Sequence, residues 1–347
     1  MRVPFPDLLH HLTRAMYALG LSPDRAALSA RLTAEATRDG VYTHGLNRFP
    51  RFVATVRNGS VNVNALPSLV FGHGALERWD GNAGVGNLNA HASMQRAITL
   101  ARTHSLGAVA LAHTNHWMRA GSFGWQAADQ GLFAICWTNT GRNLPAWGTS
   151  AATLGNNPLV LAVPRRTPAG EYAGGPHVVL DMAMSQFSYG QLDAYSKRGK
   201  QLPVPGGYDR SGALTTDPTA ITETFRALPI GFWKGSGLAL TLDLFAALLS
   251  GGNATHEISP DPLRETGLSQ FFLAIDPANV SAAAELDRAA TALIDELHQA
   301  PRSNLDETPR YPGENTLHLR EINLKTGVPV EDPAWSELLT LSRQASI

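Results

Sequence analysis

The chain has 347 residues, of which 44% are hydrophobic and 16% charged, and its formal net charge is −1. This composition excludes a disordered chain, which would be rich in charge and poor in apolar residues. Lys and Arg are spread along the whole chain, so no basic stripe points to nucleic-acid binding. The single cysteine, Cys136, excludes an intrachain disulfide framework and a thiolate metal cluster. We expect it to be a small buried side chain.

The N-terminal segment alternates apolar residues with Arg and His from Met1 to Leu19. It lacks the continuous apolar stretch of a signal peptide. No window of the sequence approaches the roughly 20 apolar residues that cross a bilayer. We therefore expect a cytoplasmic protein that does not enter a membrane.

The first 65 residues are predicted to be mainly helical. Leu8, Leu12 and Met16 recur at helical spacing in the first helix, and Gly20 is placed to end it. Ser22-Pro23-Asp24 then provides an N-cap and a proline for a second helix over 25–37. A third, short helix is predicted over 49–56.

From about residue 66 the pattern changes to alternating strands and helices. Strands are predicted at 69–71 and 76–79, as a hairpin, and at 108–112, 133–138, 159–163, 178–181 and 271–276. Helices are predicted at 86–104, 124–130, 235–250, 282–297 and 332–343. The order favours an α/β fold in which a helical layer from both chain ends packs on a central mixed β-sheet. We expect residues 1–65 and 282–347 to form the helical part, and 66–281 to bind cofactor and substrate.

Neither glycine-rich segment satisfies the Rossmann pattern, G-x-G-x-x-G directly after a strand. The segment Gly84-Val85-Gly86-Asn87-Leu88-Asn89 lacks the third glycine. The segment Gly235-Ser236-Gly237 opens a helix but follows a poor strand. The sequence therefore does not predict an ordinary dinucleotide-binding fold.

The most unusual polar segment is Gly40–Phe52, which contains His44 and Arg48 four residues apart. If a helix begins near Gly45, both side chains can face one point. An imidazole can donate a proton to a ketone oxygen, and a guanidinium can hold a carboxylate through two hydrogen bonds. That pair suits a keto acid. The simpler interpretation is that His44 caps a helix and Arg48 forms a surface ion pair.

A second polar segment, His113–Arg119, follows a predicted strand, where α/β proteins often place binding groups. His116 is a candidate for substrate contact, and the alternative is a loop of satisfied polar residues. His113 and His116 lack the third ligand that a zinc site needs, so we expect no metal.

Two further segments are candidates for cofactor binding. Asp181 ends a predicted strand and is followed by small and hydroxyl residues that suit a nicotinamide or a ribose. Lys234 and the backbone N–H groups of Phe232–Gly237 could hold a phosphate at a helix start. The alternatives are an ordinary strand-to-helix turn and an exposed capping loop.

Together these segments resemble the malate/L-lactate dehydrogenase family over nearly the whole chain. The similarity is densest in 40–52, 115–128, 135–139, 182–190, 201–209 and 228–237. The resemblance implies a homodimeric reductase of 2-keto acids that uses NADH or NADPH, with a non-Rossmann fold and a site near the subunit interface. It implies His44 as the proton donor and Arg48 and His116 as substrate contacts. The cofactor contacts that it implies are Val178, Val179, Leu180, Asp181, Met182, Ala183, Trp233, Lys234, Gly313, Glu314 and Asn315.

Within the family, the segments 115–119 and 201–209 favour a sugar-derived diketo acid as substrate. Malate, lactate, sulfolactate, ureidoglycolate and a cyclic imine carboxylate are the alternatives. Arg165–Pro176 is longer than the family's connection and suggests a hairpin tip beside the cofactor strand. Glu314 and Asn315 also differ from what the family leads us to expect after Gly313. A non-catalytic protein that binds a small acid is the alternative of another class.

Overall fold

The computed structural model describes residues 1–302 and 308–345. Its centre is a seven-stranded sheet in the order β2-β3-β4-β12-β5-β8-β9. The strands are β2 (Ser68–His73), β3 (Leu76–Asp80), β4 (Leu106–Asn115), β5 (Phe133–Thr138), β8 (Leu159–Val163), β9 (Val178–Met182) and β12 (Thr266–Ile275). Only the β3–β4 pair is parallel within this sheet; the other neighbours are antiparallel. The predicted mixed sheet is therefore confirmed.

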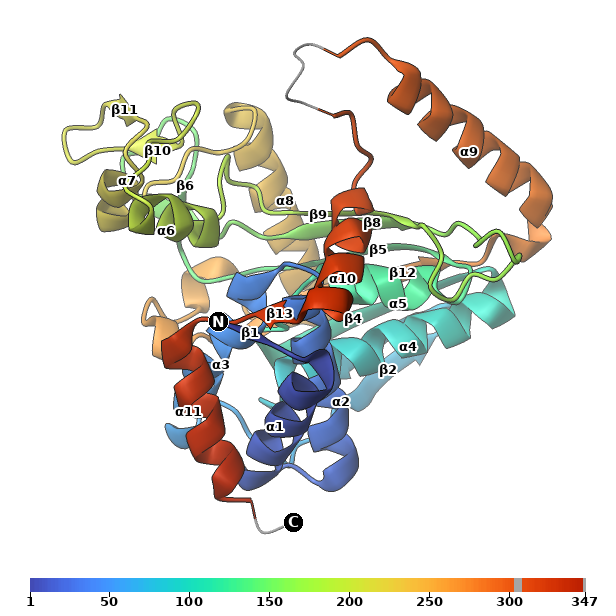
Figure 1. The fold of residues 1–347 in the computed structure, drawn as a ribbon, viewed down its shortest axis with the longest axis horizontal. Helices are drawn as coiled ribbons and strands as arrows, with labels where there is room; N and C mark the ends of the chain where they lie inside the picture. Colours follow the sequence, from blue (N-terminus) through green and yellow to red (C-terminus); the bar gives the residue numbers. More distant parts are fainter. Residues whose placement is uncertain (303–307, 346–347) are drawn as a thin grey trace.

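Helices cover both faces of the sheet (Figure 1). On one face lie α4 (Gly86–His104) and α5 (Gly121–Ala128), with a core that includes Met94 and Phe123. On the other face lies α8 (Trp233–Ser250), whose buried side includes Ala239 and Ala246. The interior of β4 is buried from residue 107 to 112, which is typical of a strand covered on both faces.

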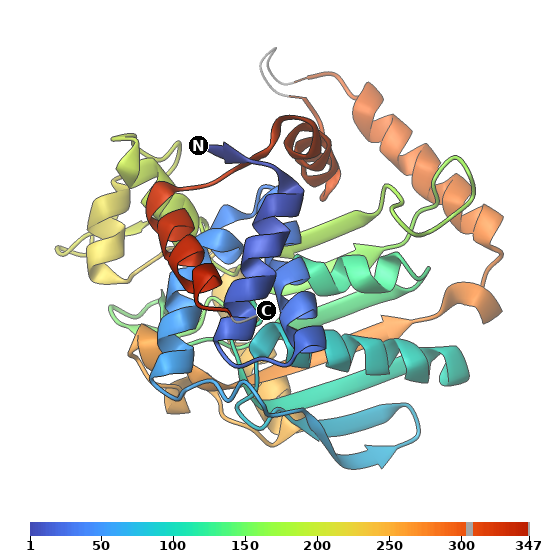
Figure 2. The ribbon, with the colours of Figure 1, turned by 60° about the horizontal axis from the view of Figure 1, so that its bottom comes forward.

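Helices from both chain ends form one layer beside the sheet (Figure 2). They are α1 (Phe5–Ala18), α2 (Pro23–Arg38), α3 (Phe49–Arg57) and α11 (Asp332–Arg343), and α10 (Glu314–Thr326) lies against α2. The chain ends also pair directly, because β1 (Arg2–Val3) is antiparallel to β13 (Val328–Pro329). Val85, Leu88 and Met118 belong to the core of this layer, so it packs on the start of α4. The predicted fold class is confirmed.

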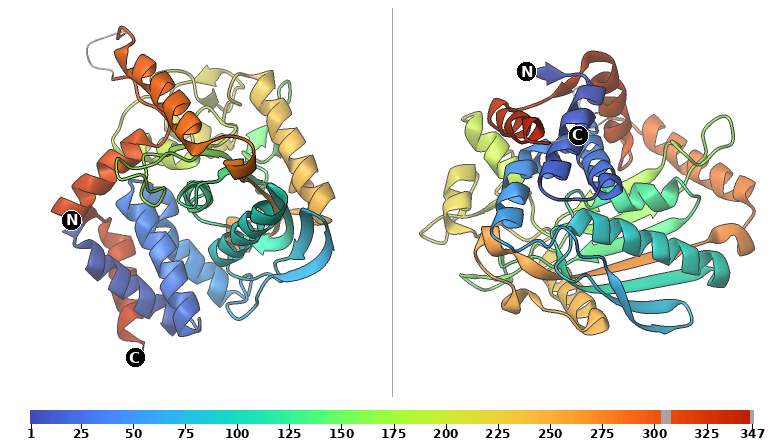
Figure 3. Two further views of the ribbon diagram at one scale, coloured as in Figure 1. Left: turned by 90° about the vertical axis from the view of Figure 1, so that its right-hand side faces the viewer. Right: turned by 90° about the horizontal axis from the view of Figure 1, so that it is seen from below.

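Helix α9 (Ala283–Gln299) forms where the sequence predicts a helix but stands away from that layer (Figure 3). Ile294 is its single buried residue, and Leu293 is 69% exposed. The helices at the C-terminal end that join the layer are therefore α10 and α11, and not α9. Residues 303–307 and 346–347 of the predicted part 282–347 lie outside the described residues. The division into domains itself stays a prediction.

A smaller lobe lies above the sheet in Figure 1, and its helices and strands were not predicted from the sequence. It contains α6 (Tyr189–Lys197), α7 (Pro218–Thr224), β6 (Leu144–Pro145), β7 (Ala152–Leu154), β10 (Gly207–Tyr208) and β11 (Leu214–Thr215). The segment Arg165–Pro176 connects the antiparallel strands β8 and β9, so the predicted hairpin tip is confirmed. Among the described residues, no helix combines the length and the apolar character needed to cross a membrane.

Candidate active site

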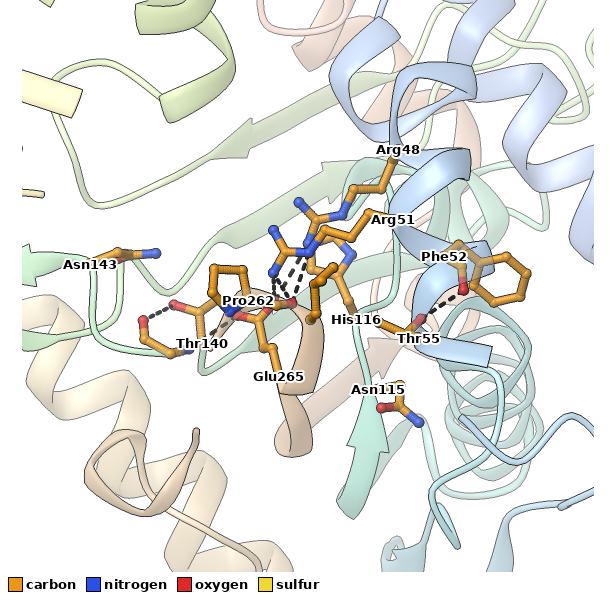
Figure 4. Close-up of polar contacts among 12 residues, drawn as sticks. Arg48, Arg51, Phe52, Thr55, Asn115, His116, Thr140, Asn143, Pro262 and Glu265 are labelled. Atoms are coloured by element: carbon orange, nitrogen blue, oxygen red, sulfur yellow. Dashed lines mark hydrogen bonds and ion pairs between the residues drawn. The ribbon is translucent and has the colours of Figure 1, made fainter. Parts of the chain in front are cut away.

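Three distant parts of the chain meet at one cavity (Figure 4). The short 3-10 helices η1 (Tyr42–His44) and η2 (Leu46–Arg48) lead into α3, the end of β4 leads into His116, and η4 (Pro262–Arg264) leads into Glu265. The cavity has a volume of about 30 Å³. It is lined by Arg48, Arg51, Phe52, Thr55, Val61, Gly86, Asn115, His116, Met118, Pro262 and Glu265. Both predicted substrate contacts, Arg48 and His116, therefore line one cavity.

His44 lies next to the cavity, in contact with His116. The two imidazole rings are stacked, with centroids 5.7 Å apart and an interplanar angle of 14°. His44 Nδ1 also lies 3.1 Å from the hydroxyl oxygen of Thr43, which orients the His44 ring. His44 itself is not among the described residues that line the cavity. His44 therefore stacks on a residue of the cavity wall, His116.

The backbone fixes the tautomer of His116. The backbone N–H of Met118 donates to His116 Nδ1 at 3.1 Å. Since Nδ1 accepts, the neutral ring carries its proton on Nε2. His116 can therefore donate a hydrogen bond to an oxygen in the cavity without being charged.

Both imidazoles are kept neutral at physiological pH. Burial lowers the pKa of His44 to about 4, and the charges of Arg48 and Arg119 act in the same direction. Burial also lowers the pKa of His116 well below its ordinary value, with further lowering by Arg48, His44 and Arg51. An anion bound among these cations would raise both pKa values again.

The two arginines of the cavity differ in how they are held. Arg51 donates to the carbonyl oxygen of Pro262 through Nε at 2.9 Å and Nη2 at 2.5 Å, and to Glu265 at 3.1 Å. Arg48 approaches Glu265 at 3.5 Å, which is its one hydrogen bond in the described chain. Burial lowers the pKa of Arg48 to about 10, and the group stays charged. Arg51 is therefore fixed, whereas Arg48 keeps donors for a ligand.

A buried carboxylate holds a third arginine beside His44. Asp39 is 2% exposed and accepts hydrogen bonds from Arg38, Arg119 and Arg320. Burial alone would raise the pKa of Asp39, but its arginine partners hold it well below its usual range. Arg119 is 5% exposed, so its charge acts on His44 with little screening by water.

Two of the predicted cofactor segments adjoin each other. The backbone N–H of Val179, in β9, donates to the carbonyl oxygen of Pro312 at 2.9 Å. Gly313, with φ +98°, follows directly and is the N-cap of α10, which begins at Glu314. A Cβ on Gly313 would lie 3.2 Å from the Val179 nitrogen, so a larger residue would press on the edge strand. Farther along the strand, Asp181 accepts from the backbone N–H of Gly121 at 2.8 Å.

The third segment, Trp233–Lys234, begins α8. It lies near the end of β9 because the backbone of residues 228–230 pairs with that of 184–186. Trp233 is 64% exposed. The backbone N–H groups of Lys234 and Gly235 already donate to the preceding turn, but the Lys234 ammonium and the exposed indole suit a phosphate and a flat ring. These residues fit a dinucleotide.

Sequence reasoning did not identify Glu265 as a residue of the cavity or the contact of Thr43 with His44. Glu265 is 217 residues from Arg48, and no local pattern links the two. The described residues hold no group of three or more His, Cys, Asp or Glu placed to bind a metal ion. Cys136 is fully buried in the core, and burial raises the pKa of its thiol.

The comparisons with known proteins agree with this architecture. The family model described as malate/L-lactate dehydrogenase matches residues 3–339. The 2,3-diketo-L-gulonate reductases of Citrobacter koseri and Shigella boydii are each 40% identical, over 98% of this chain and 100% of theirs.

Solved structures share the fold over the whole length. Sulfolactate dehydrogenase from Methanocaldococcus jannaschii has a TM-score of 0.89 at 23% identity, covering 100% of this chain and 98% of its own. The delta1-piperideine-2-carboxylate reductase from Pseudomonas syringae has a TM-score of 0.85 at 28% identity, covering 98% and 99%. This chain therefore belongs to the malate/L-lactate dehydrogenase family and is an oxidoreductase.

Proposed function

We propose that this enzyme reduces the C2 carbonyl of a small 2-keto acid with NADH, and that 2,3-diketo-L-gulonate is its substrate. The observation that carries the proposal is that Arg48 and His116 line one cavity and that the His44 ring is stacked on His116. The name of the relatives at 40% identity supports the choice of substrate. NADPH is the second candidate cofactor.

The proposed roles follow from the free donors of each side chain. Arg48 holds the substrate carboxylate, because its guanidinium keeps donors free for a bidentate pair. His116 donates from Nε2 to an oxygen of the substrate. His44 supplies the proton that the reduced oxygen needs. Its pKa of about 4 rises when the anionic substrate is bound beside Arg48 and Arg119, and the proton is taken up at that stage.

For the cofactor we propose the edge of β9 from Val178 to Ala183, the start of α8 at Trp233 and Lys234, and the segment from Gly313 to Asn315. NADH supplies the hydride when it is bound. The Lys234 ammonium would hold a phosphate, and Trp233 would lie against a ring. Gly313 allows its segment to pass close to β9, because a side chain there would press on Val179.

We also propose a homodimer in the cytoplasm with the site near the subunit interface. Helix α8 and the β2–β3 hairpin expose large apolar side chains, among them Phe71 at 62%, Phe245 at 52% and Leu248 at 76%. The two elements are continuous, since Gly251 at the end of α8 approaches Arg78 of β3. Apolar patches of this kind usually mark a partner surface. A double variant, Phe245→Glu with Leu248→Glu, is expected to elute as a monomer in light scattering, whereas Leu214→Glu in the small lobe keeps the dimer.

The test of the activity is oxidation of NADH and NADPH at 340 nm with a panel of 2-keto acids. We expect turnover with 2,3-diketo-L-gulonate, and His44→Asn should lose about 10²–10⁴-fold in kcat without losing cofactor binding. Turnover only with pyruvate, oxaloacetate or an imine acid would show that one of these acids is the substrate in place of 2,3-diketo-L-gulonate. If no combination of cofactor and 2-keto acid is turned over, the protein binds a small acid without catalysing its reduction.

A further inference from the structure

We infer that Glu265 selects the charge of the substrate: it admits 2-keto acids with one carboxylate and disfavours those with two. The inference rests on the proposed function, because it assumes that Arg48 holds the substrate carboxylate. Glu265 lines the same cavity as Arg48 and lies 3.5 Å from its guanidinium (Figure 4). Whatever binds to Arg48 therefore lies within a few ångströms of the Glu265 carboxylate.

Glu265 is held in place by its hydrogen bonds. Its Oε1 accepts from the backbone N–H of Gly141 at 3.2 Å, and its Oε2 accepts from Arg51 at 3.1 Å. Its side chain is 13% exposed. Arg51 is itself anchored twice on the carbonyl oxygen of Pro262, so it cannot swing away to expose a second positive charge. The position of the carboxylate is thus fixed.

The charges of the cavity then suit a monoanion. Arg48 and Arg51 contribute two positive charges, Glu265 removes one, and His116 is neutral because its pKa is lowered. One substrate carboxylate balances the remaining charge. A second carboxylate on a short acid would approach Glu265, which is already paired with Arg48 and Arg51, and like charges at such distances are repulsive.

The side chain of Asn115 forms a neutral and fixed part of the cavity wall. The amide nitrogen of Asn115 donates to the carbonyl oxygens of Ala83 and Gly84, both at 2.8 Å, which fixes the orientation of the side chain. Its oxygen, Oδ1, is buried and has no hydrogen-bond partner in the described chain. Asn115 brings no charge to the cavity, which therefore matches a monocarboxylate better than a dicarboxylate.

The test compares oxamate with oxalate, which have nearly the same shape but carry one and two negative charges. Binding of each to the full-length protein with NADH is measured by calorimetry, which does not depend on turnover. We expect the wild type to prefer oxamate, and Glu265→Gln to shift the ratio of affinities toward oxalate by about tenfold or more. The ratio of kcat/KM for oxaloacetate over pyruvate should shift in the same direction.

Glu77→Gln is the matched control, because Glu77 pairs with Arg96 at 2.6 Å outside the cavity. Like Glu265→Gln, it neutralises a carboxylate that is paired with an arginine. It should leave the oxamate-to-oxalate ratio of affinities unchanged. An unchanged ratio in Glu265→Gln would overturn the inference while leaving the reductase activity intact. If Glu265→Gln does not fold, a wild type that binds oxalate as well as oxamate would also overturn it. A preference for oxamate without turnover of any keto acid would instead reject the proposed function alone.

Discussion

Replacing His44 by Asn should make the protein less sensitive to mild acid. The pKa of His44 is about 4 in the folded chain, whereas an ordinary histidine has a value of 6.5. Between these two values the unfolded chain binds a proton at this position and the folded chain does not. The free energy of unfolding therefore falls as the pH decreases through this window, and the contribution is fully present above pH 6.5.

The size of this effect follows from the two pKa values. The full difference corresponds to about 3 kcal/mol, since one pKa unit corresponds to about 1.4 kcal/mol. Most of it falls between pH 7 and pH 5, where His44 should reduce the free energy of unfolding by about 2 kcal/mol. His116, whose pKa is also lowered, adds to the same trend in the wild type. In His44→Asn, the pH-dependent loss of unfolding free energy that comes from His116 should remain.

The assay is urea unfolding followed by tryptophan fluorescence at pH 7 and pH 5, for the wild type and His44→Asn. The wild type should lose about 2 kcal/mol more than the variant over this interval. Asn47→Ala is the control, because Asn47 lies in the same segment and donates to Glu331 but does not titrate. An equal loss in the wild type and in His44→Asn would refute the assignment of a lowered pKa to His44.

Two further predictions concern the cavity walls. Arg48→Lys should raise the KM for the 2-keto acid by about 10–100-fold, because a lysine cannot form the bidentate pair, and steady-state kinetics would show a smaller change in kcat; an unchanged KM would remove Arg48 from carboxylate binding. Gly86→Ala should lower both the melting temperature and kcat/KM, because the added Cβ would collide with the backbone carbonyl oxygens of Asn115 and His116; thermal unfolding that matches the wild type would contradict this close approach.

The regular elements of the sheet were predictable because their side-chain patterns repeat. The helix Gly86–His104 and the strands Phe133–Thr138 and Leu159–Val163 have the bounds that the sequence predicts. Strand β4 is longer than its predicted core at 108–112 and runs to Asn115. Its last residues are polar, and pairing with β12 keeps them in the sheet despite their low strand propensity.

Other elements lack such a pattern. Helix α10 was not predicted, because its apolar residues do not gather on one face and only Asn323 is buried. Helix α6 is also weakly patterned, although its capping box of Ser188 and Gln191 was a local signal. The independent position of α9 could not be read from its amphipathic sequence, which would equally suit a helix packed on the core.

The candidate site was predictable only for residues that are close together in the sequence. His44 and Arg48 are four residues apart, and the chemistry of their side chains is enough to indicate a keto acid. The contact between Arg48 and Glu265 depends on tertiary structure, because η4 and β12 bring a residue from far along the chain to the cavity. The lowered pKa values likewise come from burial and from arginines that meet only in the folded chain.

The place of β12 in the sheet has a consequence for biosynthesis. This strand is made from residues 266–275, yet it separates β4 from β5, which end at residues 115 and 138. During translation, those two strands leave the ribosome long before their shared neighbour exists, so each keeps an unpaired edge. The sheet is completed only by a contact that is distant in sequence, which favours slow folding. A nascent chain that stops before residue 266 therefore has no central strand, and it is a natural target for chaperones that cover exposed strand edges.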